Sequence, residues 1–103
     1  MTIINIDEKE ILNQATPKYR REAIFFYTTL CGTCKLGERM LEIIEGMDKH
    51  IPIRKMNINY CPILRDAWKI TSVPCLVILK NGEPDQFVYA MRSVDYLYGL
   101  LKE

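Results

Sequence analysis

The chain has 103 residues, of which 49% are hydrophobic and 26% are charged, and its 14 basic and 13 acidic side chains leave a formal net charge of +1. This length suits a single domain with its own hydrophobic core, so we expect residues 1–103 to form one domain. The mixed charges argue against a nucleic-acid-binding protein, and the longest apolar runs are far shorter than the ~20 residues that a membrane-spanning helix needs. Because the N-terminal residues lack the pattern of a secretory signal, we expect a cytoplasmic protein.

Hydrophobic periodicity and turn signals predict strands and helices in alternation. In chain order they are a small strand over 2–6, a helix over 8–15 capped by Asp7, a strand over 23–29, a helix that begins after Cys31 and Gly32, a strand over 51–58, a helix with Pro62 in its first turn, two strands joined by Asn81-Gly82, and a helix capped by Ser93. Strand–helix–strand units imply parallel pairing, and the closing hairpin adds antiparallel strands. We therefore expect an α/β fold of three layers, with a central mixed β-sheet covered by helices on both faces.

Two of the four cysteines, Cys31 and Cys34, form a C-x-x-C at the point where a buried strand passes into a helix. Such a pair can be a structural disulfide, half of a metal site or a reversible redox pair. Because thiols of cytosolic proteins are usually kept reduced, the structural disulfide ranks last. A zinc site normally needs a second close pair, whereas Cys61 and Cys75 are fourteen residues apart and His50 is the single histidine. The pattern favours redox chemistry without a metal, and a metal half-site and an inert pair stay open as alternatives.

The two cysteines are expected to differ in reactivity. Cys31 falls near the N-cap of the helix, where free backbone N–H groups and the helix dipole favour a thiolate. Cysteines at such sites can have pKa values of about 3.5–7.5 instead of about 8.5. Cys34 comes one turn later and should be more buried. We therefore expect Cys31 to attack and Cys34 to resolve.

Two segments, "YTTLCGTCK" and "ITSVPCLVILKNGE", make the chain resemble the thioredoxin family over nearly its whole length. The family motif Trp-Cys-Gly-Pro-Cys-Lys corresponds here to Leu30 through Lys35, so Gly32, Thr33 and Lys35 support the two cysteines. The resemblance implies a thioredoxin fold and a cis Val73-Pro74 peptide that faces the disulfide. Pro74 would keep metals off the cysteines, and the backbone of Val73 would pair with an extended substrate. Leu30, Gly32, Thr33 and Val73 would then line the substrate groove.

The chain also departs from the family pattern. The buried acid that the family carries five residues before the first cysteine is replaced by Phe25. Lys55, which matches the partner of that acid, is left without it and is either a surface lysine or a cation that tunes Cys34. The helix-kinking proline is replaced by Arg39, and we expect Gly37 to loosen the helix instead. A glycine near the end of the last strand is replaced at Tyr89 or Ala90.

The resemblance implies a protein-disulfide reductase that acts on disulfide-containing proteins as a monomer, takes electrons from a thioredoxin reductase and needs no cofactor. One alternative is a thioredoxin-fold interaction module with little turnover. Another is a glutaredoxin-like reductase linked to glutathione, which Ser72-Val73-Pro74 would allow, but the expected Gly-Gly segment is missing around Met91-Arg92.

Two further expectations concern residues around the motif. Thr33 replaces a proline and frees a backbone N–H for the Cys31 thiolate, which predicts a more oxidising pair than in typical thioredoxins. Phe25 predicts slow resolution, since Cys34 lacks a nearby acid. Cys75 follows Pro74 and is either close to the reactive thiols or a small core residue, and Cys61 is expected to be a helix cap without chemistry.

Overall fold

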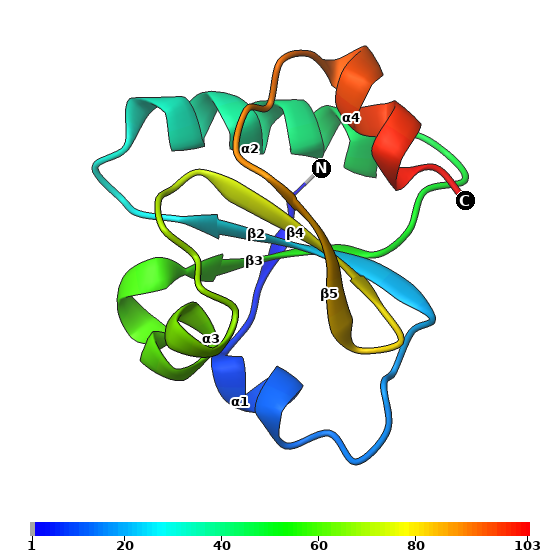
Figure 1. Ribbon diagram of the computed structural model, residues 1–103. Coiled ribbons are helices and arrows are strands. Elements are labelled where there is room, and N and C mark those ends of the chain that lie inside the picture. Colours follow the sequence, from blue (N-terminus) through cyan, green and yellow to red (C-terminus); the bar gives the residue numbers. More distant parts are fainter. Residues whose placement is uncertain (1) are drawn as a thin grey trace.

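Within residues 2–103, which the computed structural model describes, a five-stranded sheet runs through the middle of the molecule (Figure 1). The elements are β1 (Ile4–Asn5), α1 (Glu8–Leu12), β2 (Arg21–Tyr27), α2 (Gly32–Glu45), β3 (Ile53–Asn57), the short 3₁₀ helix η1 (Ile58–Tyr60), α3 (Pro62–Ala67), β4 (Cys75–Lys80), β5 (Glu83–Val88) and α4 (Val94–Leu101). The strand order is β1-β3-β2-β4-β5. Strand β3 pairs in parallel with both β1 and β2, whereas β4 runs antiparallel to β2 and to β5. The mixed sheet predicted from the sequence is confirmed.

Strand β2 lies at the centre of the sheet and is buried on both faces. Its residues 22–26 are all buried, so the apolar run predicted over 23–29 is fully buried only from Ala23 to Phe26, and Thr29 is exposed. Because side chains alternate along a strand, Ala23 and Phe25 point to one face while Ile24 and Phe26 point to the other. Strand β2 therefore contributes side chains to the hydrophobic core on both faces of the sheet.

The buried apolar side chains of residues 2–103 form two clusters, one on each face of the sheet. The first cluster includes Phe25, Leu41 and Leu97 and lies under α2 and α4. The second includes Phe26, Ile11 and Leu64 and lies under α1 and α3. Figure 1 shows the two helix pairs on opposite sides of the sheet, which confirms the three-layer α/β/α arrangement.

The first helix forms where it was expected but ends early. Asp7 accepts the N–H of Lys9, and Glu10 accepts the N–H of Asp7, so the predicted capping box is present. The helix ends at Leu12 and not at residue 15. A proline disfavours helical geometry at the residue before it, and Pro17 follows too closely for another turn.

The hairpin between β4 and β5 turns at Asn81 and Gly82, as predicted. Their φ angles of 53° and 82° lie in the left-handed region that a type I′ turn requires at both positions. A Cβ at Gly82 would lie 2.9 Å from Pro17 Cγ, so glycine is also required by the close approach of the 13–20 segment. Among residues 2–103, the helices are all too short or too polar to cross a membrane.

Candidate active site

Cys31 is the N-cap residue of α2, as the sequence predicted. Its backbone is extended, and its Sγ accepts the N–H of Cys34 at 3.2 Å. Cysteine sulfur therefore takes the position that Ser, Thr or Asp oxygen takes at most helix starts. A thiolate formed at this sulfur would receive the same N–H and would lie at the positive end of the 14-residue helix.

The two cysteines form a disulfide with a Cα–Cα distance of 5.1 Å, within the usual range for this bond. Cys31 is half-buried, whereas Cys34 is only 2% exposed and belongs to the cluster under α2. An attacking sulfur from outside can therefore reach Cys31 more easily than Cys34. This asymmetry fits the roles predicted for the two residues.

Thr33 differs in detail from the expectation. The backbone N–H that reaches the Cys31 sulfur is that of Cys34, and Thr33 instead places its hydroxyl Oγ1 3.4 Å from Cys31 Sγ. The Thr33 side chain is exposed and can turn its hydroxyl hydrogen toward a thiolate. The Thr33 side chain is therefore a second group, besides the backbone N–H groups, that can stabilise a thiolate at Cys31.

The Val73–Pro74 peptide is cis, as the resemblance implied. Pro74 and Thr33 lie on a groove of about 270 Å³ between α2 and the segment that joins β5 to α4. We call this the α2 groove; its lining residues are Thr33, Leu36, Gly37, Met40, Pro74, Tyr89, Ala90, Met91 and Arg92. The groove lies beside the disulfide and is lined mostly by apolar side chains.

The sequence predicted only part of this groove. Leu30 is 96% exposed and stands beside the disulfide rather than among the lining residues. Gly32 is exposed, and a Cβ there would meet no atom within 4 Å, while Val73 is half-buried against both clusters. The residues from Tyr89 to Arg92 were missed because they follow the last strand in a loop, where periodicity carries no signal.

Lys55 lacks the acid that the family places on the strand, as expected, but it pairs with a different carboxylate. Its Nζ lies 2.9 Å from Glu38 Oε2 and 5.4 Å from the centre of the Tyr27 ring. Phe25 is fully buried beneath α2, so the strand position holds no acid, as the sequence shows. The acid stands instead on α2, four residues after Cys34, a spacing that places two side chains on the same face of a helix.

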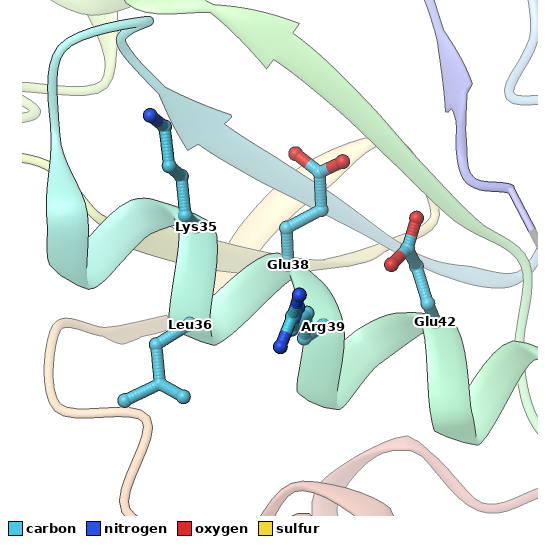
Figure 2. A pocket seen from close by; sticks show the side chains of 5 residues that line it. All are labelled: Lys35, Leu36, Glu38, Arg39 and Glu42. Atoms are coloured by element: carbon cyan, nitrogen blue, oxygen red, sulfur yellow. The ribbon is translucent and has the colours of Figure 1, made fainter.

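A second recess is lined by Cys34 itself and has a volume of about 270 Å³. We call it the Cys34 recess; its lining residues are Tyr27, Thr28, Thr29, Cys34, Lys35 and Glu38. The sequence had placed Lys35 beside the motif, and it borders this recess, while Lys55 reaches it through Glu38. A separate depression of about 460 Å³ runs along the outer surface of α2 over Lys35, Leu36, Glu38, Arg39 and Glu42 (Figure 2). Neither Cys31 nor Cys34 is among the described lining residues of that depression, whereas Cys34 lines the Cys34 recess and Thr33, which contacts Cys31 Sγ, lines the α2 groove, so we place the chemistry at these two sites.

Gly37 does not loosen α2, which corrects an expectation. The helix continues without a break from Gly32 to Glu45, and Gly37 is buried in it. A Cβ at this position would lie 3.1 Å from Met91 Cγ and 3.3 Å from Phe25 Cζ. Glycine is therefore present because Phe25 and Met91 pack closely against the helix, while Arg39 is exposed.

The other two cysteines are free thiols on the opposite face of the sheet from Cys34. Burial raises the pKa of Cys61 to about 11, with Glu8 adding to the effect, and the thiol donates to the Asn57 carbonyl at 3.4 Å. Burial also raises the pKa of Cys75 to about 11, although Tyr89 lowers it slightly. Cys61 is the N-cap of α3 but makes no capping hydrogen bond with its side chain. Both thiols are core groups with little nucleophilic character at neutral pH.

His50 lies away from the cysteines, at the end of α2. Its ring nitrogens lie 2.8 Å from the Ile51 carbonyl and 3.3 Å from the Glu45 carbonyl, which gives it a structural role. No group of three or more His, Cys, Asp or Glu side chains within residues 2–103 is placed to hold a metal ion.

Comparison with known proteins identifies the architecture. The family model described as Thioredoxin matches residues 4–103. The thioredoxin-like protein YusE of Bacillus subtilis is 39% identical over 80 residues, which are 78% of this chain and 76% of that protein. The thioredoxin of Staphylococcus saprophyticus is 33% identical over 79 residues, which are 76% of each chain.

Solved structures agree in fold. A mutant thioredoxin from Halobacterium salinarum superposes with a TM-score of 0.78 at 21% identity, over 97% of this chain and 88% of that one. The oxidised form of mitochondrial thioredoxin 3 from Saccharomyces cerevisiae gives a TM-score of 0.75 at 21% identity, over 94% of this chain and 92% of that one.

Proposed function

The chain belongs to the thioredoxin family and is a thiol-disulfide oxidoreductase, and from that premise we propose that it reduces disulfides in proteins with Cys31 as the attacking thiol and Cys34 as the resolving thiol. The single observation that carries this assignment is the asymmetry of the pair. The half-buried Cys31 Sγ accepts an N–H at the start of α2, while Cys34 is 2% exposed.

The reaction proceeds in two exchanges. The Cys31 thiolate attacks one sulfur of the substrate disulfide, a mixed disulfide forms, and the other substrate sulfur leaves as a thiolate that takes up a proton. The Cys34 thiolate then attacks Cys31 Sγ, the Cys31–Cys34 bond forms, and the second substrate sulfur leaves. Two electrons have passed to the substrate, and the oxidised pair must be reduced again by an external donor.

The remaining site residues support these steps. The apolar α2 groove, with Thr33 and Pro74 beside the disulfide, suits an extended segment of a substrate protein. Val73 would pair its backbone with that segment, and the exposed Leu30 would contact it from the other side. Gly32 leaves open space around the attacked sulfur, since no atom lies within 4 Å of the place a Cβ would take. Lys35 and Lys55 supply positive charge near Cys34.

We further propose that a thioredoxin reductase is the electron donor and that residues 1–103 act as one cytoplasmic, monomeric domain. Both faces of the sheet are covered by the chain's own helices, which supports a domain that needs no second copy (Figure 1). Two buried free thiols suit a reducing compartment.

We expect NADPH with thioredoxin reductase to sustain reduction of a protein disulfide such as that of insulin, and glutathione with its reductase to sustain it much less. Cys31→Ser should abolish the reaction, because no thiol remains that can attack. Cys34→Ser should attack but not resolve, so the mixed disulfide should accumulate and be visible by mass spectrometry. Preferential support by glutathione would favour the glutaredoxin-like alternative, and no turnover with either donor would favour the interaction module.

A further inference from the structure

The resolving thiol needs a group that accepts its proton. The acid available in this structure lies on α2 and not on strand β2, where Phe25 stands. Beneath Cys34 the sheet presents Phe25, which is fully buried and cannot take a proton. Cys34 also lines the Cys34 recess, where Glu38 supplies the carboxylate among the described lining residues. Cys34 and Glu38 are four residues apart on α2, so they lie on one face of the same helix.

The Glu38 carboxylate is held in place from the sheet. Lys55 on β3 donates to Glu38 Oε2 at 2.9 Å, and the two side chains are only 17% and 25% exposed. Figure 2 shows Glu38 and Lys35 pointing to the same side of α2, while Leu36 points away from it. An exposed glutamate would sample many rotamers, but this one is fixed between the helix and β3.

The surroundings of Glu38 favour movement of a proton within the recess. The titratable and charged groups that face it in the recess are Lys55 from β3, Tyr27 from β2, and Lys35 and Cys34 from α2, while Arg39 and Glu42 border the outer depression together with it. The recess volume of about 270 Å³ is several times the ~30 Å³ that one water occupies in the liquid. Water in the recess can therefore connect the Cys34 thiol to the carboxylate.

We propose that Glu38 accepts the proton of Cys34 through water in the Cys34 recess, and that Lys55 positions its carboxylate; this inference rests on the proposed function. In the resolving step the Cys34 S–H proton passes to Glu38, the thiolate attacks Cys31 Sγ, and the mixed disulfide breaks with release of the substrate thiolate. The negative charge moves from Glu38 to Cys34, and the protonated carboxyl group then returns its proton to solvent or to the leaving thiolate. When the reductase later reopens the disulfide, the same carboxyl group can protonate Cys34.

The test separates the two exchanges. Reduced protein is mixed with one equivalent of an aromatic disulfide in a stopped-flow instrument, and thiolate release is followed by absorbance. The first phase reports attack by Cys31, and the second reports resolution by Cys34. In Glu38→Gln the second phase should slow by roughly tenfold or more near pH 7, a modest part of the ~10²–10⁴-fold effect of a positioned general base, while the first phase is unchanged.

The pH profile distinguishes a proton acceptor from a structural residue. Without the carboxylate the thiolate forms by exchange with solvent, so the second phase of Glu38→Gln should rise about tenfold per pH unit between pH 6 and 8. The wild-type phase should be much flatter. Glu38→Asp should recover part of the rate, which keeps the test valid even if the glutamine variant folds poorly.

Glu42→Gln is the matched control, because Glu42 lies one turn further along α2 on the outer depression and does not line the Cys34 recess. It should behave as wild type in both phases. If Glu38→Gln and wild type share one second-phase pH profile, the inference is overturned while the proposed function stands. If wild-type protein gives no first phase at all, the proposed function itself fails.

Discussion

Thr33, one of the two residues between the cysteines, acts on Cys31 through a single atom, its hydroxyl oxygen. Thr33 Oγ1 lies 3.4 Å from Cys31 Sγ, so its hydroxyl can donate to a thiolate in addition to the Cys34 N–H. Hydrogen bonds to charged groups are stronger than neutral ones and favour the charged form. A stabilised thiolate makes the reduced protein more stable and the disulfide more oxidising.

Thr33→Val removes the hydroxyl and keeps the branched shape of the side chain. We expect slower alkylation of Cys31 near pH 7 and a redox potential more negative by about 30 mV, which corresponds to ~1.4 kcal/mol for a two-electron couple. Thr33→Ser keeps the hydroxyl and serves as the control, with little change expected. Thr33→Pro should also shift the potential to more negative values. Equal potentials for the valine and serine variants, measured against a glutathione buffer, would contradict a role for the hydroxyl.

The sequence predicted only part of the surroundings of Cys34. It showed correctly that Phe25 is no acid, but it did not show that Lys55 pairs with Glu38. The i, i+4 spacing of Cys34 and Glu38 is visible in the sequence, whereas the contact between α2 and β3 depends on how the helix lies over the sheet. Register and helix placement are properties of the whole fold, so this ion pair could not be predicted from local pattern.

Helix α2 contains a glycine, Gly37, although glycine weakens a helix. Glycine costs about 1 kcal/mol relative to alanine in a helix interior. At Gly37 this cost is accepted because Phe25 and Met91 approach so closely that a Cβ would lie 3.1–3.3 Å from their side chains. At Gly99 in α4, by contrast, a Cβ would meet no atom within 4 Å.

These two glycines form a matched pair for stability measurements. Gly99→Ala should raise the free energy of unfolding by roughly 0.5–1 kcal/mol, because it gains helix propensity without a clash. Gly37→Ala should lower it, since overpacking typically costs about 1–3 kcal/mol and exceeds the same gain. Urea unfolding followed by circular dichroism measures both. A Gly37→Ala variant as stable as Gly99→Ala would show that Met91 and Phe25 move aside freely.

Element prediction succeeded where residues carry their own geometric signal. The capping box at Asp7, the Asn81-Gly82 turn and the Ser93 cap all appear as expected, because each depends on residues close in sequence. The η1 turn and the early end of β2 were not predicted, since a strand ends where tertiary contacts stop supporting it. The α2 groove was only partly predicted for the same reason. The early end of α1 was missed although its cause, Pro17, is a local signal in the sequence.

In the whole molecule, the two buried thiols make the free energy of unfolding depend on pH in the alkaline range. The pKa values of Cys61 and Cys75 are raised from 9.0 to about 11 in the folded protein. Between these values the unfolded chain has released protons that the folded chain still holds. The stabilisation is therefore complete below pH 9 and is lost as the pH rises toward about 11.

We expect the free energy of unfolding of the reduced protein to fall between pH 9 and 11. The variant that combines Cys61→Ala and Cys75→Ala should show a shallower fall, although small cavities make it less stable at every pH. The slope of the free energy of unfolding against pH, and not its absolute value, is the quantity to compare, because lysines and tyrosines titrate in both proteins over this range. Parallel slopes in urea titrations would mean that the thiols are not the groups responsible.

The division of the core by the sheet also limits which sulfurs can exchange partners. Four cysteines allow three ways of forming two disulfides. Cys34 lies in the cluster under α2 and Cys31 packs against that cluster, whereas Cys61 and Cys75 lie in the cluster under α1 and α3. A folded molecule can thus be oxidised and reduced repeatedly at Cys31 and Cys34 without scrambling into the mispaired isomers, which become accessible only when the strands between the two clusters separate.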